Sequence, residues 1–200
     1  MQSDPGHLAD QPDDTWPLTG SVDLHRGDWV ISLRSDSIRR PGPGATSDFR
    51  RLVVEHPGAV VVLALDDERR VVCLRQYRHA VRHRLIELPA GLRDSPAEPA
   101  LETARRELRE EVELEAEHWT PLLSTWSSPG FTDERLDLFL ARGLRPCPRG
   151  EFVLEHEEAE MEQLLVPFDE LLAAVLDGRV ADGPVVQAVL AVKVRGLDHP

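Results

Sequence analysis

Apolar runs of strand length recur along the chain and are separated by short polar turns. The longest, residues 58–65 (GAVVVLAL), has no polar or charged side chain, which is typical of a strand buried on both faces of a sheet. A charged turn over residues 66–69 leads to a second apolar run at residues 70–77. Shorter runs predict further strands at residues 85–88, 119–124, 136–141 and 163–167.

Helical periodicity appears where the spacing of apolar residues changes. Residues 99–112 predict an amphipathic helix, and Pro99 suits its first position. Two further helices are predicted over residues 168–176 and 184–194. Strands that alternate with helices predict an α/β fold, in which helices cover both faces of a mixed sheet. In the first helix, apolar residues recur every four positions, at Ala100, Ala104, Leu108 and Val112.

The N-terminal quarter of the chain differs in composition from the rest. Residues 1–18 are polar, acidic and proline-bearing, which predicts a disordered tail. Residues 19–55 contain three short and rather polar strands, which would be marginal as an independent unit. We therefore expect this strand arm to pack on the main domain, residues 56–200, or on a second copy of the chain. The three strands are expected at residues 21–24, 28–34 and 49–55.

Composition restricts the partners. The protein has 200 residues and a formal net charge of −13, which argues against nucleic acid because phosphate contacts need a basic surface. Cys73 and Cys147 form neither a spaced metal motif nor a disulfide framework, as in a reducing cytoplasm. No apolar run approaches the ~20 residues of a membrane span. We expect a cytoplasmic protein that binds a small molecule.

Three carboxylates crowd one face of the first predicted helix. Glu107 and Glu111 are four residues apart, and Glu107 and Glu110 are three apart. Like charges at these spacings cost an isolated helix ~0.2–0.5 kcal/mol per pair. A hard divalent cation would offset this repulsion and use the oxygens as ligands. The pattern favours a magnesium site, and the alternative is a solvated acidic helix face.

Residues 87–114 resemble the Nudix box, G-x5-E-x7-R-E-U-x-E-E-x-G-U, in which U is a bulky aliphatic residue. Residues 106–111 read RELREE, and Glu98 falls on the first glutamate. One departure is an extra residue between Gly91 and Glu98. The other is Glu113, which replaces the glycine that ends the helix in a left-handed conformation. Because that conformation costs other residues ~1 kcal/mol, we expect the helix end to differ here.

Further motifs are similar to the ADP-ribose pyrophosphatase branch, and most of all to its actinobacterial members. The resemblance implies a Nudix α/β/α sandwich and a homodimer with an exchanged N-terminal strand arm. It also implies hydrolysis of ADP-ribose to AMP and ribose 5-phosphate with Mg²⁺ or Mn²⁺. The motifs are VEHPGAV at residues 54–60, QYRH at 76–79, ELPAG at 87–91, SPGFTDE at 128–134 and EEAE at 157–160.

The resemblance assigns a metal site to the helix and the loop before it. Glu107 and Glu111 would be the principal ligands, and Glu111 also counts among the catalytic residues. Glu110 would bind directly or through water, and the Ala90 carbonyl would complete the site. Arg106 would orient the carboxylates by ion pairing. A pyrophosphate needs cations on its oxygens because its own negative charge repels an attacking water.

The general base is expected outside the box. The family places a catalytic glutamate on the acidic loop, which puts this role on Glu158, with Glu157 as the second choice. The alternative is a solvated acidic loop without a catalytic role. Glu98 is expected to be structural, because a carboxylate suits the start of a helix.

Four residues resemble substrate-binding positions. Arg78 would pair with the substrate phosphates, although a surface ion pair is the alternative. Ser128 and Glu134 would bind the terminal ribose, or else serve the turn that contains them. Gly91 would lie beside the substrate. Two other functions stay open: a Nudix hydrolase of other nucleoside diphosphate sugars, and a non-catalytic ligand-binding module.

Overall fold

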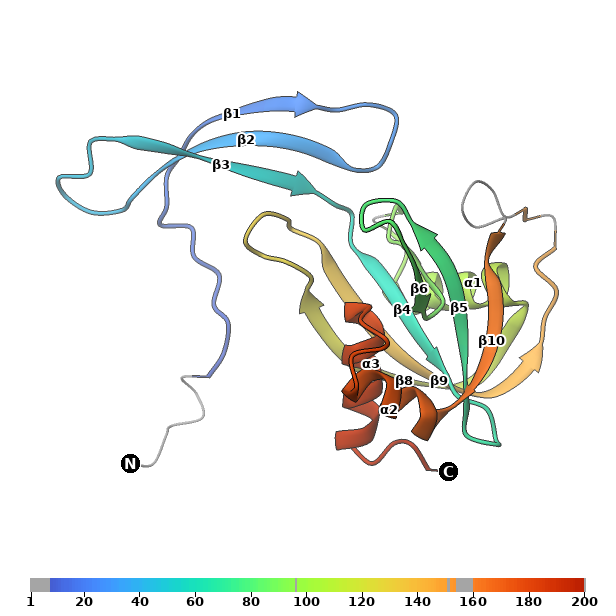
Figure 1. Ribbon diagram of the computed structural model, residues 1–200. Helices are drawn as coiled ribbons and strands as arrows, with labels where there is room; N and C mark the ends of the chain where they lie inside the picture. The colour runs from blue at the N-terminus through green and yellow to red at the C-terminus, as the bar shows by residue number, and fades with distance from the viewer. Residues whose placement is uncertain (1–7, 96, 151, 154–159, 200) are drawn as a thin grey trace, which may run out of the picture. The chain divides into compact units, whose positions relative to one another are not determined.

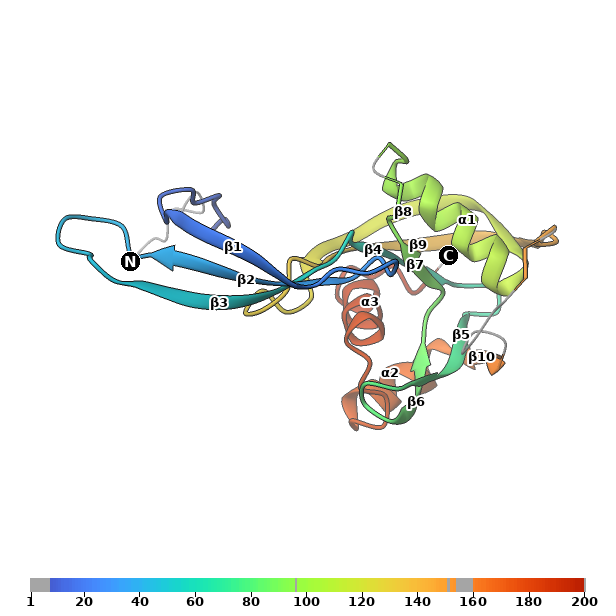
Figure 2. The same cartoon turned by 90° about the horizontal axis from the view of Figure 1, so that it is seen from above.

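The chain forms two compact units. The first comprises residues 8–55 with residues 130–132, and the second comprises residues 56–129 and the chain from residue 133 onward. Figures 1 and 2 show the elements of both units. The computed structural model describes residues 8–95, 97–150, 152–153 and 160–199.

The first unit is an antiparallel sheet of three strands in the order β1-β2-β3. The strands expected in this region are present, but β2 begins at Ser32 and not at residue 28. The apolar stretch at residues 29–31 suggested an earlier start, yet Trp29 lies in a bend and is 68% exposed. The strands are β1 (Leu18–His25), β2 (Ser32–Arg39) and β3 (Asp48–Glu55).

The end of the expected disordered tail contacts this sheet. The ring of Trp16 packs edge-on against Phe49, with ring centroids 6.2 Å apart. The Pro17 carbonyl accepts a hydrogen bond from the Arg39 N–H (3.1 Å). Order therefore begins before Leu18, because an aromatic side chain and a backbone hydrogen bond anchor the segment.

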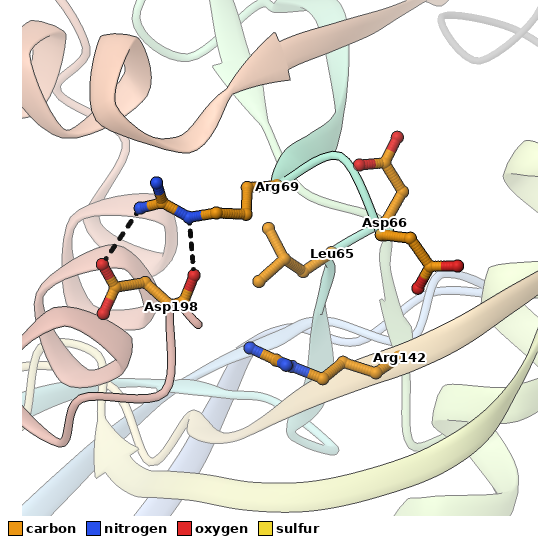
Figure 3. Close-up of a pocket in the computed structure, with 6 residues that line it drawn as sticks. Leu65, Asp66, Arg69, Arg142 and Asp198 are labelled. Atoms are coloured by element: carbon orange, nitrogen blue, oxygen red, sulfur yellow. Dashed lines mark hydrogen bonds and ion pairs between the residues drawn. The ribbon is translucent and has the colours of Figure 1, made fainter. Parts of the chain in front are cut away.

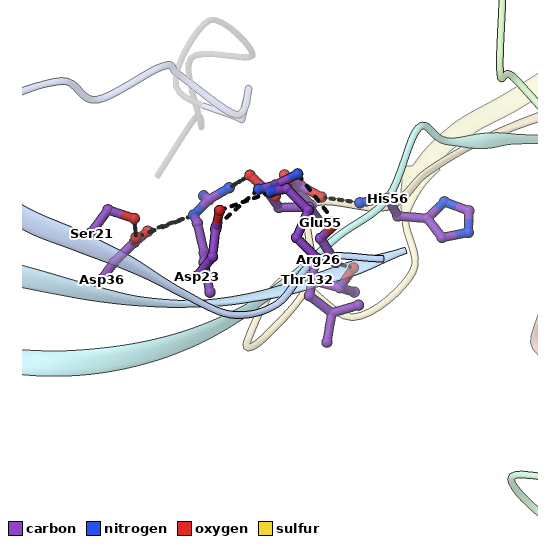
Figure 4. Close-up of polar contacts among 11 residues, drawn as sticks. Ser21, Asp23, Arg26, Asp36, Glu55, His56 and Thr132 are labelled. Carbon is purple, nitrogen blue, oxygen red and sulfur yellow. Dashed lines mark hydrogen bonds and ion pairs between the residues drawn. The ribbon is translucent and has the colours of Figure 1, made fainter. Parts of the chain in front are cut away.

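Polar contacts join the three strands of the first unit (Figure 4). The Glu55 carboxylate accepts hydrogen bonds from Arg26 and Arg34, which hold its pKa below the usual value. The buried Asp36 accepts from Arg34 Nε (3.0 Å) and Ser21 Oγ (2.7 Å). Every residue of β1 is exposed. The sheet thus depends on ion pairs and hydrogen bonds more than on an apolar core.

The second unit contains two sheets and three helices in its described residues. The sheet β7-β4-β9-β8 is mixed, since β4 runs parallel to β9 and antiparallel to β7. The sheet β10-β5-β6 is antiparallel. The elements are β4 (Ala59–Ala64), β5 (Arg70–Arg78), β6 (His83–Glu87), β7 (Ala90–Leu92), α1 (Ala100–Val112), β8 (Leu114–Trp126), β9 (Arg135–Pro146), β10 (Glu162–Pro167), α2 (Phe168–Leu176) and α3 (Gly183–Val194).

Helices cover both faces of the mixed sheet. Val60 and Val62 of β4 pack with the apolar face of α1, whereas Val61 and Leu63 pack with α2 and α3. Figure 2 shows α1 on one side of β4 and β9 and the other two helices on the opposite side. The apolar run of β4 is therefore buried on both faces, and the unit has the α/β/α layers that the sequence predicted.

Two strands extend beyond their predicted limits. β8 begins at Leu114 and β9 ends at Pro146, whereas the sequence predicted strands only over residues 119–124 and 136–141. The paired ends carry alternating charged residues, and little apolar periodicity marks them. The sequence predicted no strand at β7, because three residues are too few to show a period. Among the described residues, no helix is long and apolar enough to cross a membrane.

Helix α1 begins and ends close to its predicted limits. Pro99 is the N-cap, one position before the first helical residue. At the other end Glu113 adopts the left-handed conformation (φ 56°, ψ 40°), so the expectation of a different helix end is wrong. The Glu113 carbonyl accepts from the Cys147 N–H (2.8 Å), and Arg149 donates to the Glu111 carbonyl (3.3 Å). These contacts hold the end of the helix in the conformation that glycine normally supplies.

We predict that Glu113→Gly raises the free energy of unfolding by about 1 kcal/mol, because glycine adopts this conformation without steric cost. Urea unfolding of the variant would measure the change. Glu113→Ala is the matched control, since it loses the carboxylate but keeps the Cβ. Equal stabilisation by both variants would assign the effect to charge and contradict backbone strain.

Candidate active site

Helix α1 presents its acidic face to strand β7. The carboxylate of the buried Glu107 lies against Gly91, so that a Cβ placed on Gly91 would stand 2.0 Å from Glu107 Cδ. The adjacent Ala90 N–H donates a hydrogen bond to Glu111 Oε2 (2.9 Å). A Cβ at position 91 would therefore displace the Glu107 carboxylate from its present place. Two of the predicted metal-binding carboxylates therefore lie on the Ala90–Gly91 backbone.

Arg106 lies among the glutamates of the helix. Its Nη1 is 2.7 Å from Glu107 Oε1 and 2.9 Å from Glu110 Oε2, and its Nη2 is 3.6 Å from Glu98 Oε2. Glu98 also accepts from Thr103 Oγ1 (2.9 Å), as expected of a carboxylate at the start of the helix. The ion pairs expected of Arg106 are present. A single guanidinium thus offsets much of the like-charge repulsion on this face.

The predicted ligands are adjacent but are not gathered around one point. In the part of the chain that the structure describes, no three acidic, histidine or cysteine side chains are grouped so as to hold a metal ion. Their chemistry fits a hard cation, because carboxylate and carbonyl oxygens are the ligands that Mg²⁺ prefers. Gly91 has no side chain, so no atom of residue 91 beyond its backbone stands in front of the Glu107 carboxylate. The metal roles of Ala90, Glu107, Glu110 and Glu111 stay a prediction.

Arg78, at the end of β5, forms an ion pair with Glu87. Its Nε and Nη2 donate to the two Glu87 oxygens at 2.8 and 2.7 Å, and these bonds raise the pKa of the guanidinium. Glu87 is buried, so the pair is fixed in direction. The charges of Glu111 and Asp182 also act on Arg78. The alternative of an ion pair is therefore real, and a phosphate-binding role for Arg78 stays a prediction.

Asp182 adds a third carboxylate near Arg78. Its side chain caps helix α3 by accepting from the Val185 N–H (3.1 Å). Burial raises the pKa of Asp182 to about 6, and the nearby Glu87 carboxylate adds to this effect. The sequence placed Glu87 within the ELPAG motif but gave it no role. The sequence feature that could have indicated a role for Glu87 is a charged residue at the end of a short apolar strand.

The two predicted ribose-binding residues lie in the turn between β8 and β9. Glu134 Oε1 is 3.6 Å from His56 Nε2, and the Glu134 carbonyl accepts from the Ser127 N–H (3.1 Å). Ser128 is partly buried. The turn roles that were the alternative are thus present for Glu134, and ribose binding by both residues stays a prediction. The proposed bases, Glu157 and Glu158, lie outside the described residues.

A separate pocket lies at the opposite end of β4 (Figure 3). It has a volume of about 280 Å³ and is lined by the turn after Leu65, by Arg142 of β9 and by Asp198. Arg69 donates to the Asp198 carbonyl (2.8 Å) and carboxylate (3.2 Å), and Arg142 donates to the Leu197 carbonyl. These charged groups satisfy one another. These contacts attach the C-terminal segment to the sheet. The pocket is lined by none of the predicted site residues.

We predict that Gly91→Ala weakens Mn²⁺ binding at least tenfold in isothermal titration calorimetry, because the added Cβ displaces Glu107 from β7. A shift of about 1 Å in a site costs on the order of 100-fold in function. Gly183→Ala is the control, since a Cβ there meets nothing within 4 Å. If Gly91→Ala binds Mn²⁺ with the wild-type affinity, the Ala90–Gly91 backbone is not part of the metal site.

Comparison with known proteins agrees with this geometry. The family model described as NUDIX domain matches residues 55–189. An ADP-ribose pyrophosphatase of Mycobacterium tuberculosis is 44% identical over 172 residues, which cover 86% of this chain and 80% of the relative. A methanol dehydrogenase activator of Bacillus methanolicus is 36% identical over 160 residues, covering 80% and 83%.

A solved structure shares the fold. It is described as an ADP compounds hydrolase and superposes with a TM-score of 0.72 at 20% identity, covering 94% of this chain and 98% of its own. The sequence relatives confirm the resemblance to the ADP-ribose pyrophosphatase branch. With the carboxylates of α1 packed on the glycine of β7, these matches show that the chain belongs to the Nudix family and is a Nudix pyrophosphohydrolase.

Proposed function

We propose that this enzyme hydrolyses the pyrophosphate bond of ADP-ribose to AMP and ribose 5-phosphate. The packing of Glu107 and Glu111 on the Ala90–Gly91 backbone supports cleavage of a pyrophosphate, and the observation that carries the choice of ADP-ribose is a sequence relative. A relative that is 44% identical over most of the chain is an ADP-ribose pyrophosphatase. The same carboxylates would serve other nucleoside diphosphate sugars, so substrate choice depends on residues outside the helix.

Nudix hydrolases generally use divalent metal ions, and here we propose Mg²⁺ or Mn²⁺. Glu107, Glu111 and the Ala90 carbonyl would hold the cation, and Glu110 would bind directly or through water. The bound metal would neutralise charge on the diphosphate and acidify the attacking water. Arg106 keeps the carboxylates oriented through its ion pairs with Glu107 and Glu110.

We assign the remaining steps to the other predicted site residues. Glu158 accepts a proton from the attacking water, with Glu157 as the second choice. Arg78 contacts a substrate phosphate while Glu87 fixes its orientation. Ser128 and Glu134 bind the terminal ribose through hydrogen bonds. A carboxylate and a hydroxyl suit a sugar, and they disfavour a triphosphate because its added charge would meet Glu134.

We also propose that the enzyme is a homodimer that exchanges its strand arm. In the first unit the side chains of Val22 (63% exposed) and Leu24 (54%) leave apolar surface on β1. Three exposed strands with little apolar core gain stability when a second copy covers them. The partners of this protein are then its substrate and its own second copy.

A substrate panel tests the proposed activity. We expect AMP to appear fastest from ADP-ribose when the protein is incubated with Mg²⁺ and ADP-ribose, GDP-mannose, ADP-glucose or 8-oxo-dGTP. Chromatography of the products would identify both halves. Preference for another diphosphate sugar would contradict the ribose assignments of Ser128 and Glu134. Absence of any turnover would favour a non-catalytic, ligand-binding role.

Two isosteric variants separate metal binding from proton transfer. Glu111→Gln should abolish ADP-ribose turnover and also weaken Mn²⁺ binding, because it removes a charged ligand. Glu158→Gln should lower the rate by about 100-fold or more while Mn²⁺ affinity stays at the wild-type value. Calorimetry and single-turnover kinetics would measure the two quantities. A larger rate loss in Glu157→Gln would move the base by one residue.

The exchanged arm predicts an assembly that surface charges disrupt. We expect Val22→Glu combined with Leu24→Glu to give a monomer in multi-angle light scattering, whereas the wild type is a dimer. Both side chains are exposed within the chain, so the change should leave the circular dichroism spectrum intact. Leu8→Glu, which changes a residue that is 83% exposed and precedes the sheet, serves as control. A monomeric wild type, or an unaffected dimer, would count against the exchange.

A further inference from the structure

A row of paired residues crosses the mixed sheet at the level of the site. Gly91 of β7 pairs with Val60 of β4, Val60 pairs with Asp137 of β9, and Asp137 pairs with Ser124 of β8. Paired residues point to the same face of a sheet. Gly91 faces Glu107, and Val60 packs in the core beneath α1, so the whole row lies on the α1 face. The row therefore places Asp137 on the same face as the carboxylate site.

Arg93 connects this row to strand β7. It follows Gly91 by two residues, and its N–H donates to the Gly58 carbonyl (3.0 Å). Its side chain reaches back across β4, where Nη1 donates to Asp137 Oδ2 (3.0 Å). The Asp137 side chain is only 14% exposed and that of Arg93 31%. The pair thus links the strand that carries Ala90 and Gly91 to β9, two strands away.

The Arg93 side chain is held in place by its contacts, although this position costs free energy. Its Nε is buried and has no hydrogen-bond partner among the described residues, which costs free energy because the atom has left water. An exposed arginine would avoid this cost by turning toward solvent. The ion pair with Asp137 and the packing of the arginine stem beside Gly58 keep it in place. Sequence motifs gave no role to either residue.

Strand β7 has few other attachments. It is three residues long and pairs only with β4 within the described chain. Yet its backbone carries the contacts to both Glu107 and Glu111. A small displacement of β7 would therefore move both carboxylates at once. An error of about 1 Å in such a site costs on the order of 100-fold in rate.

We propose that Arg93 and Asp137 are positioning residues, whose ion pair holds the Ala90–Gly91 backbone against the carboxylates of α1. The pair acts through β7 and does not touch the substrate. This role rests on the proposed function of the same site, since it matters only if that backbone and those glutamates bind the cation. Through Asp137 it adds a requirement that lies outside the Nudix box, on a strand that carries none of the proposed ligands.

The same aspartate supplies matched controls. Ser124 Oγ donates to Asp137 Oδ1, and Arg135 Nε lies 3.9 Å from that oxygen. Both residues lie at Asp137 Oδ1, whereas Arg93 donates to Oδ2, so neither takes part in the link to β7. Ser124→Ala thus removes a partner of Asp137 and leaves the connection to Arg93 intact. If disturbing Asp137 and β9 in general weakened Mn²⁺ binding, Ser124→Ala would weaken it too. A loss that depends on the link to β7 would leave Ser124→Ala at the wild-type affinity.

The test measures Mn²⁺ binding to the full-length protein by calorimetry without substrate, and then kcat and KM for ADP-ribose. For Arg93→Leu we expect about tenfold weaker Mn²⁺ binding and a kcat lowered by 10- to 100-fold. KM should change less than threefold, because the pair does not touch substrate. Ser124→Ala should stay within twofold of wild type in all three. Asp137→Asn should resemble Arg93→Leu, and the two losses should not add.

A charge-exchanged double variant protects the test from simple misfolding. Arg93→Asp combined with Asp137→Arg should recover a large part of the lost Mn²⁺ affinity, which a generally damaged fold would not do. Wild-type Mn²⁺ affinity in Arg93→Leu, or equal loss in Ser124→Ala, would overturn the proposal. A wild-type protein that binds Mn²⁺ but does not cleave ADP-ribose would overturn the proposed function and leave the positioning role testable by affinity alone.

Discussion

The structure depends on one close approach, that of the acidic face of α1 to the backbone of β7. Glu107 lies where a side chain of residue 91 would be, and Glu111 accepts a hydrogen bond from the Ala90 N–H. This contact depends on the absence of a side chain at Gly91 and on the packing of α1 against the sheet. The rest of the second unit supplies this packing: β4 is buried on both faces, and α1 packs on it through Leu108 and its neighbours.

Electrostatic compensation makes the approach possible. Three glutamates share one helix face, and the guanidinium of Arg106 lies within ion-pair distance of two of them. Further out, Glu87 orients Arg78 by a two-point contact. In each case a buried or half-buried charge is fixed by an opposite charge, which orients the groups that we propose act on a diphosphate. A bound cation would offset the remaining negative charge of the α1 glutamates in the same way.

Much of this could be predicted from the sequence, because the informative patterns are local. The apolar run of β4 and the four-residue spacing in α1 gave the layers, and the glutamate spacing gave the helix face. Contacts between distant segments could not be read in this way. The link between Arg93 and Asp137 joins strands two positions apart in the sheet. Glu113 shows the same limit: the sequence predicted a different helix end, but the residue adopts the left-handed conformation, and contacts from residues 147 and 149 hold this end of the helix.

The most direct test of the central claim is the position of the cation itself. Anomalous diffraction from crystals grown with Mn²⁺ and a non-hydrolysable ADP-ribose analogue would locate the metal. The account predicts a peak about 2.1 Å from carboxylate oxygens of Glu107 and Glu111, with the diphosphate on the opposite side of the ion. A peak away from α1, or a diphosphate bound without contact to that face, would contradict it.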